Sequence, residues 1–578
     1  MKLKKIDRKY TTLGKKDLFK EIIATICLRK LRWSFTFLAF QVIAFLESGF
    51  IALLYFILDA NKRSLAQNKV MAIVARFHDS SFLAEPRFVY LLFCGCFFFL
   101  CASMLTRYAS EVNLLRLQHD LCLHYSKRIT ALYFHASLSI ARKIGRERIV
   151  SSIIYDCRSM ADSSRKLLEI AGAVCAFFVF ITVACLLSAK MLGIAALVYV
   201  LPLWINRKGY RKIKNISSIK VTTQEELLSF YTDTLSGLER IKLDALETIV
   251  LEKAKEMVRK DWEWRTTQQK IKSKLRVSMD GLAFFGLLLV LFVGVVVFQE
   301  KMSILLVLFV IFNRIKTQVT IFSSSSMVLG EKIPHVYRYF ELSKELEGKA
   351  ISMEPEESLD FDCIEMKGVH FRYEEALVLK NIDFKAERGD RILIQGSSGH
   401  GKSTFLEVLT GLLTPTEGEV RIDGRLFDEI LFHKIRHQIA YVSTEVYLFE
   451  DTLKNNLLLA CPEKENALEQ ALALSGTDKL IHELPQGLDT HLGRNGNALS
   501  LGQRARVILA RLYLKNPRLI LLDEATANLD PALEEQIMQN LETHHPNAIV
   551  ILVAHKAPKG IRFNKVFQMQ RGVMSVGT

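Results

Sequence analysis

The sequence predicts two domains of different class, an α-helical domain with six membrane spans followed by an α/β domain. The chain has 578 residues, more than one domain usually holds, and 50% of them are hydrophobic, with a mean hydropathy of +0.18. Apolar residues form long runs in the first part of the chain and short, interrupted runs in the rest. With 24% charged residues and only 11 prolines, the composition excludes a collagen-like or disordered protein.

Six apolar runs are predicted as transmembrane helices, because a helix rises about 1.5 Å per residue and the hydrocarbon layer is about 30 Å thick. Lys and Arg are concentrated in the N-terminal segment and in the long polar connections, which have helical periodicity. The positive-inside rule therefore places both termini in the cytoplasm. It also accounts for much of the net charge of +16, so nucleic acid is not an expected partner. The predicted spans are residues 33–59, 88–105, 167–187, 191–205, 279–298 and 302–322.

The predicted domain boundaries follow the composition. Residues 1–345 form the membrane domain, 346–360 a charged linker, and 361–578 the α/β domain, in which short strand-like runs alternate with amphipathic helices. The N-terminal lead-in is basic and has no cleavage-site pattern, which favours an uncleaved, multi-pass protein of a bacterial inner membrane. The ten cysteines include no CxxC pair, so neither disulfides nor a zinc site are expected.

A P-loop is the clearest motif of the α/β domain. The strand-like run RILIQ is followed by G-x-x-x-x-G-K-S and a helical run. Glycines allow backbone N–H groups to approach phosphates, and the helix start adds partial positive charge. Lys402 is expected to reach the β- and γ-phosphates of ATP, and Ser403 to ligate Mg²⁺. The predicted ATP-binding residues of this loop are Gly396, Ser397, Ser398, Gly399, His400, Gly401, Lys402, Ser403 and Thr404.

Two carboxylates follow a second apolar run. Leu519 to Leu522 precede Asp523 and Glu524, as in a buried parallel strand that ends at the sheet edge beside the P-loop. Asp523 is expected to hold Mg²⁺ through its water shell, and Glu524 to polarise the attacking water. The pattern therefore predicts a Mg²⁺ ligand, Asp523, followed directly by a catalytic residue, Glu524.

Between these motifs, the segment LSLGQ opens an amphipathic, Arg-rich helix. It resembles the LSGGQ signature of the ATP-binding cassette (ABC) family. The resemblance implies that Ser500, Leu501, Gly502 and Gln503 contact a nucleotide held by the other cassette of a dimer. It also implies that Tyr373 stacks on adenine, that Asp530 is the D-loop carboxylate, and that His555 is the switch histidine at the γ-phosphate.

The chain departs from the family pattern at three places. Thr444 stands where the family has a glutamine that senses Mg²⁺, Arg494 reverses the charge expected before the signature, and Leu501 replaces a signature glycine. These departures are compatible with a specialised subgroup or with one of two unequal halves.

The resemblance covers nearly the whole chain, which looks like a half-size exporter of the type IV (type I exporter) fold. It implies an ATPase coupled to transport, with ATP and Mg²⁺ as cofactors and a second half as partner; a homodimer is favoured and a heterodimer remains an alternative. Residues 134–157 and 230–243 resemble the family's coupling segments. The expected substrate is an amphipath that meets the membrane lipids, namely a lipid, a lipid-linked glycan or a peptide. The alternatives are a peptide or toxin exporter half and a weakly hydrolysing regulatory half.

Three charged residues lie inside predicted spans. Glu47 is roughly 21 Å into the first span, and Arg314 and Lys316 are about 18 to 21 Å from the outer end of the sixth. Intramembrane charge is costly unless it is paired or hydrated. We expect these residues either to line a substrate cavity, where cations suit an anionic amphipath, or to form a structural Glu47–Arg314 pair.

Overall fold

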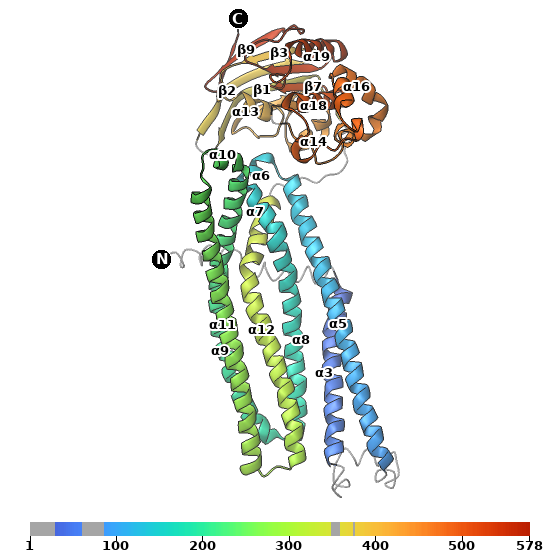
Figure 1. Cartoon of the computed structure of the whole chain (residues 1–578), viewed down its shortest axis with the longest axis vertical. Coiled ribbons are helices and arrows are strands. Elements are labelled where there is room, and N and C mark those ends of the chain that lie inside the picture. Colours follow the sequence, from blue (N-terminus) through green and yellow to red (C-terminus); the bar gives the residue numbers. More distant parts are fainter. Residues whose placement is uncertain are drawn as a thin grey trace. The chain divides into compact units, whose positions relative to one another are not determined.

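The computed structural model describes residues 29–59, 86–347, 359–373, 376–444, 446–459 and 461–577. Two compact units are present, one built from long helices and one from sheets and short helices (Figure 1). The first 28 residues of the predicted lead-in and most of the predicted linker, residues 348–358, lie outside the described residues.

Long helices make up the first unit, and several continue far beyond the apolar runs that predicted them. The polar connections are therefore helical extensions of the spans, as their periodicity predicted. Short helices lie within the two segments that resemble coupling regions, and a π-helical stretch precedes α8. The elements are α3 (Lys30–Asp59), α5 (Pro86–His135), α6 (Leu138–Ile144), α7 (Arg146–Ser151), η3 (Ser152–Asp156), α8 (Cys157–Leu187), α9 (Ala189–Ser236), α10 (Leu238–Leu243), α11 (Glu247–Val296) and α12 (Met302–Glu347).

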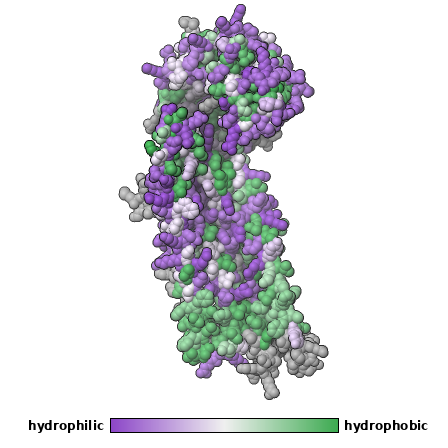
Figure 2. Space-filling model, in the orientation of Figure 1, coloured by the Kyte–Doolittle hydropathy of each residue, from purple (hydrophilic) through white to green (hydrophobic). Residues whose placement is uncertain are grey.

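Five helices of the described chain, α3, α5, the continuous α7–α8 stretch, α11 and α12, are long and apolar enough to cross a membrane. The predicted fourth span, residues 191–205, lies within α9 but is not among the five, and the structure gives no side-chain description for residues 191–206. Figure 2 shows hydrophobic side chains gathered over the part of this unit where α3 ends and α12 begins.

The apolar core of the helical unit lies between α3, α8, α11 and α12. Helix α12 packs closely on α8, while α3 packs on α5 and on α8. Phe180 of α8 and Phe312 of α12 are almost fully buried in this core, together with small residues such as Ala44 and Ala176. The helices of different sequence regions are thus held together by ordinary close packing.

The second unit contains two sheets. The larger has the order β10-β9-β3-β8-β7-β6, in which all neighbours are parallel except β10 and β9. The smaller is antiparallel, with the order β2-β1-β4-β5. Strand bounds are β1 (Cys363–Tyr373), β2 (Ala376–Glu387), β3 (Arg391–Gln395), β4 (Glu417–Ile422), β5 (Arg425–Leu426), β6 (Ile439–Ser443), β7 (Leu519–Asp523), β8 (Ile549–Val553), β9 (Lys565–Gln570) and β10 (Val573–Val576).

Helices cover both faces of the larger sheet, because a central strand such as β7 has apolar side chains on both faces. Leu519 and Leu521 belong to the apolar cluster that includes α13, whereas Ile520 and Leu522 belong to the cluster of α18 and α19. A strand buried on both faces is apolar at every position. A third cluster of leucines joins the helices of a separate subregion. The helices are α13 (Lys402–Leu409), α14 (Glu429–Ile435), α15 (Leu453–Leu458), α16 (Leu468–Leu474), α17 (Asp478–Glu483), α18 (Leu501–Lys515) and α19 (Pro531–His544).

Candidate nucleotide-binding site

The loop between β3 and α13 forms a tight backbone cradle. Gly401 caps α13 with φ +97°, a left-handed conformation that favours glycine. A Cβ atom on Gly396 would meet the carbonyl oxygen of Met569, so the backbone at this point has no room for a side chain. The first N–H groups of α13 therefore point into a loop that a phosphate group fits.

The ammonium of Lys402 is held inside this loop. Its Nζ donates to the carbonyl oxygens of Gly396 and Ser397 at 2.9 and 3.1 Å, and the residue is only 6% exposed. A positive charge is thus fixed where the backbone donors converge, as phosphate binding requires.

Asp523 ends β7 next to the start of α13. Its carboxylate accepts hydrogen bonds from the Ser403 hydroxyl and, at 3.1 Å, from the Tyr441 hydroxyl. Burial raises the pKa of Asp523 above its ordinary value, and the hydrogen bonds oppose that shift only in part. A buried carboxylate beside a hydroxyl is an oxygen donor set that fits Mg²⁺, which takes few protein ligands and completes its shell with water and phosphate.

Glu524 follows Asp523 in a strained conformation, with φ +51°. Its N–H donates to the Val553 carbonyl at 3.0 Å, which fixes the turn out of the strand. Its Oε1 lies 3.4 Å from Nε2 of His555 and 3.8 Å from Nζ of Lys402. The structure therefore brings together the predicted residues Lys402, Ser403, Asp523, Glu524 and His555.

The signature residues are organised locally. Ser500 caps α18, and its side chain and that of Gln503 exchange hydrogen bonds of 2.9 and 3.2 Å with each other's backbone. Gly502 lies so close to Asn528 that a Cβ atom would be 2.8 Å from its carbonyl oxygen, and Leu501 is 54% exposed. Within the described chain, none of these side chains has a hydrogen bond or ion pair with the phosphate loop.

Two other residues of the family pattern also have local partners. The carboxylate of Asp530 accepts from the N–H of Ala532 and caps α19. Tyr373 ends β1, lies edge-on to Phe371 at 4.9 Å, and donates to Glu407 at 3.2 Å. Its ring is 40% exposed, which leaves surface for a stacked base.

The departures from the pattern lie at different distances from the centre. Thr444 comes directly after β6, next to Ser443, whose Cα is paired with that of Asp523. Arg494 forms an exposed ion pair with Glu450 at 3.5 Å. Tyr441, which was not predicted from the sequence, is the residue of β6 whose hydroxyl reaches Asp523. The alternation of side chains along the strand was the only sequence pattern that bore on its direction.

The intramembrane charges belong to the helical unit. Glu47 is 5% exposed and pairs with Arg314 at 3.2 Å, and also with Arg107 at 2.9 Å. Lys316 is separate: it pairs with Asp280 at 3.5 Å and lies over the ring of Phe284. The structure thus joins Glu47 and Arg314, adds an arginine that was not predicted, and leaves Lys316 outside the group.

Comparison with known proteins finds relatives of part of this chain. Residues 379–527 match the family model described as ABC transporter. Multidrug resistance protein 1 of Entamoeba histolytica is 34% identical over 216 residues, which are 36% of this chain and 17% of that protein. A putative multidrug export ATP-binding/permease protein of Staphylococcus aureus is 34% identical over 219 residues, 37% of this chain and 38% of that protein. The chain therefore matches less than two fifths of the length of either relative.

A solved structure resembles the whole chain. It is the structure of a bacterial Atm1-family ABC exporter with ATP bound, with a TM-score of 0.80 over 95% of both chains and 19% sequence identity. At that identity the likeness establishes the fold.

Proposed function

We propose that this chain, which carries an ABC transporter cassette and has the fold of an ABC exporter, is one half of an ATP-driven exporter or flippase. It would move an amphipathic substrate (a lipid, a lipid-linked glycan or a peptide) across the cytoplasmic membrane through six spans, the fourth being the apolar part of α9. The observation that carries the proposal is the convergence of Lys402, Asp523, Glu524 and His555 around the phosphate loop.

Each residue has a role that follows from its position. The loop N–H groups and Lys402 hold the β- and γ-phosphates of ATP. Ser403 and Asp523 would hold Mg²⁺, whose charge would offset the charge that develops on the phosphates. Glu524 accepts a proton from the attacking water, and His555 stabilises the γ-phosphate. Phosphoryl transfer needs positioning and charge neutralisation more than covalent chemistry, and this site supplies both.

A second half completes the site in this proposal. Ser500 is exposed at the start of α18. Among the described residues, neither Ser500 nor Gly502 has a hydrogen bond to the phosphate loop of its own cassette. The signature of one cassette would therefore cover the nucleotide of the other, and ATP would favour the closed dimer because it binds both halves. We favour a homodimer, since Lys402, Asp523, Glu524 and His555 are all present in this one chain.

A weakly hydrolysing regulatory half is the second candidate, and Thr444 favours it. Thr444 directly follows Ser443, whose Cα is paired with that of Asp523, and its side chain is shorter than the glutamine that the family pattern has at this position. A peptide or toxin exporter half of a heterodimer is the corresponding transport alternative.

Reconstitution into liposomes tests the proposal. In the molecules that insert inside-out, the cassette faces the outer solution, where Mg²⁺ and ATP would be added. Labelled phospholipids and hydrophobic peptides would then be followed across the bilayer. We expect ATP-dependent movement of at least one amphipath, and none with Glu524→Gln. ATP hydrolysis without movement of any candidate would contradict export and favour the regulatory role.

A further inference from the structure

A pocket of about 250 Å³ lies between helices α3, α5, α8 and α12. Glu47, Arg107 and Arg314 line it, and we call it the Glu47 pocket. Its other walls are largely apolar and include Phe40, Ile43 and Ile321. One space therefore offers both charged groups and a hydrocarbon surface.

The positive charges at Glu47 exceed the negative ones. Arg107 and Arg314 both bond to the same atom, Oε1 of Glu47. Within the described chain, neither guanidinium has an ion pair with another carboxylate. Each guanidinium has five N–H donors, so most of these donors remain available for a second anion.

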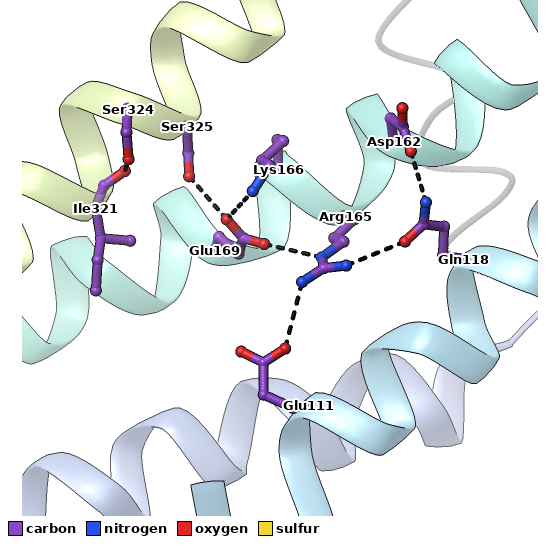
Figure 3. A network of polar contacts seen from close by, with 9 residues as sticks. All are labelled: Glu111, Gln118, Asp162, Arg165, Lys166, Glu169, Ile321, Ser324 and Ser325. Atoms are coloured by element: carbon purple, nitrogen blue, oxygen red, sulfur yellow. Dashed lines mark hydrogen bonds and ion pairs between the residues drawn. The ribbon is translucent and has the colours of Figure 1, made fainter. Parts of the chain in front are cut away.

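The remaining carboxylates of the pocket already have their own cations (Figure 3). Glu169 accepts from Lys166 at 2.6 Å, from Ser325 at 2.8 Å and from Arg165 at 3.0 Å. Arg165 also reaches Glu111 at 3.3 Å. Arg165 and Lys166 do not line the pocket, but they bind the two other carboxylates that do, Glu111 and Glu169. Of the three lining carboxylates, only Glu47 therefore offsets the charge of Arg107 and Arg314.

The depth of the pocket suits a lipid head group. Glu47 and Arg314 each lie roughly 18 Å from the ends of α3 and α12 that Figure 2 shows as hydrophobic. In a hydrocarbon layer of about 30 Å this is just past the middle, on the cytoplasmic side, and long arginine side chains extend from there toward the head groups. A charge surplus at that depth is costly without a counter-anion.

We propose that the Glu47 pocket binds an anionic amphipath. Its phosphate or carboxylate would lie between Arg107 and Arg314, and its chain would lie against Phe40, Ile43 and Ile321. Glu47 serves as the internal counter-ion that competes with this head group. The inference rests on the proposed function, because it names the class of substrate that the exporter moves.

The test measures which lipid the full-length protein retains. Protein in nanodiscs of equal phosphatidylglycerol and phosphatidylcholine would be delipidated gently, and the retained lipids would be counted by native mass spectrometry. We expect a preference for phosphatidylglycerol that falls about tenfold in Arg107→Gln and in Arg314→Gln. Lys316→Gln is the matched control, since it removes a charge from the same helix outside the pocket, and it should keep the preference.

Glu47→Gln separates binding from a purely structural ion pair. Removal of the competing carboxylate should raise the preference for phosphatidylglycerol, whereas a structural pair predicts no gain. Unchanged preference in both arginine variants, or a loss in Lys316→Gln equal to theirs, would overturn the proposal. Arg107 is largely exposed, so its variant stays informative if Arg314→Gln fails to fold.

Two further outcomes define the ligand and its relation to transport. Inorganic phosphate that displaces the retained lipid as well as soluble phosphatidylglycerol does would overturn an amphipathic ligand, because phosphate has no chain. If Arg107→Gln and Arg314→Gln lose the lipid preference but still transport the substrate at the wild-type rate, the lipid in the pocket is not the substrate. That outcome would reject this inference and leave the proposed function standing. Preserved preference without any effect of Glu524→Gln on transport would reject the proposed function alone.

Discussion

The two sites of this protein are built in opposite ways. In the cassette, Lys402 and Ser403 are neighbours in the chain, as are Asp523 and Glu524, and parallel strands bring these pairs to one sheet edge. In the helical unit, Glu47, Arg107 and Arg314 come from three helices and meet only after these helices pack. A site made of contiguous segments is visible in the sequence, and a site made by packing is not.

The largest expected effect concerns the contiguous site. Lys402→Ala removes the buried charge of the phosphate loop and should weaken Mg²⁺–ATP binding about 100-fold. Titration with a fluorescent ATP analogue measures it. Lys385→Ala, which removes an exposed lysine paired with Glu387, should change nothing. Equal affinity in wild type and Lys402→Ala would show that the loop is not the nucleotide site.

A packed polar cluster in the helical unit should show a large effect on stability. Asp156 is fully buried and pairs with His335 at 2.7 Å and with Arg338 at 3.1 Å. Asp156→Ala removes the carboxylate from both ion pairs and should lower the free energy of unfolding by about 3 kcal/mol. The exposed ion pair of Asp244 and Arg240 is the control, and Asp244→Ala should lower the free energy of unfolding by about 0.5 kcal/mol. Equal shifts of the thermal midpoint in detergent would contradict this ranking.

A smaller effect is expected at the residue that the sequence analysis missed. Tyr441→Phe removes the hydroxyl that donates to Asp523 and should reduce the apparent affinity for Mg²⁺ about fivefold. The Mg²⁺ dependence of ATP turnover measures this change. Tyr447→Phe, at an exposed ring, is the control. Identical Mg²⁺ curves for all three proteins would mean that Tyr441 does not position Asp523.

The smallest predicted effect is a gain in stability, at Asp523, that accompanies a loss of activity. Burial raises the pKa of Asp523, so its ionised form destabilises the nucleotide-free fold at pH values above that pKa. Asp523→Asn should therefore raise the thermal midpoint at pH 7 and lower activity. The gain should shrink as the pH falls through the raised pKa of the folded state and vanish below the ordinary value of 3.8, where the aspartate is protonated in both states. A lower midpoint at pH 7 would contradict the prediction.

The two domains and the cassette site could be predicted from the sequence at all because their signals are local. Leu519 to Leu522 predicted a buried strand, and the strand ends where Asp523 and Glu524 were expected. Tyr441 carried no such signal, since an aromatic residue in a strand is usually packed.

The charges inside the membrane show the limit of this reasoning. Arg314 and Lys316 are two residues apart in one helix, so they point in different directions and reach different partners. Arg107 lies two residues beyond the predicted end of the second span and was not considered, although it pairs with Glu47. Such partners depend on how α3, α5 and α12 pack, which periodicity alone does not specify.

The most direct test of the central claim is Mg²⁺-dependent ATP turnover by the purified chain in lipid, compared with Glu524→Gln. We predict turnover by the wild type, a loss of about 100-fold or more in the variant, and no loss in Glu469→Gln, an exposed control. Equal turnover in wild type and Glu524→Gln, or none from a folded, ATP-binding wild type, would contradict the claim that two copies of this chain form a complete hydrolytic site.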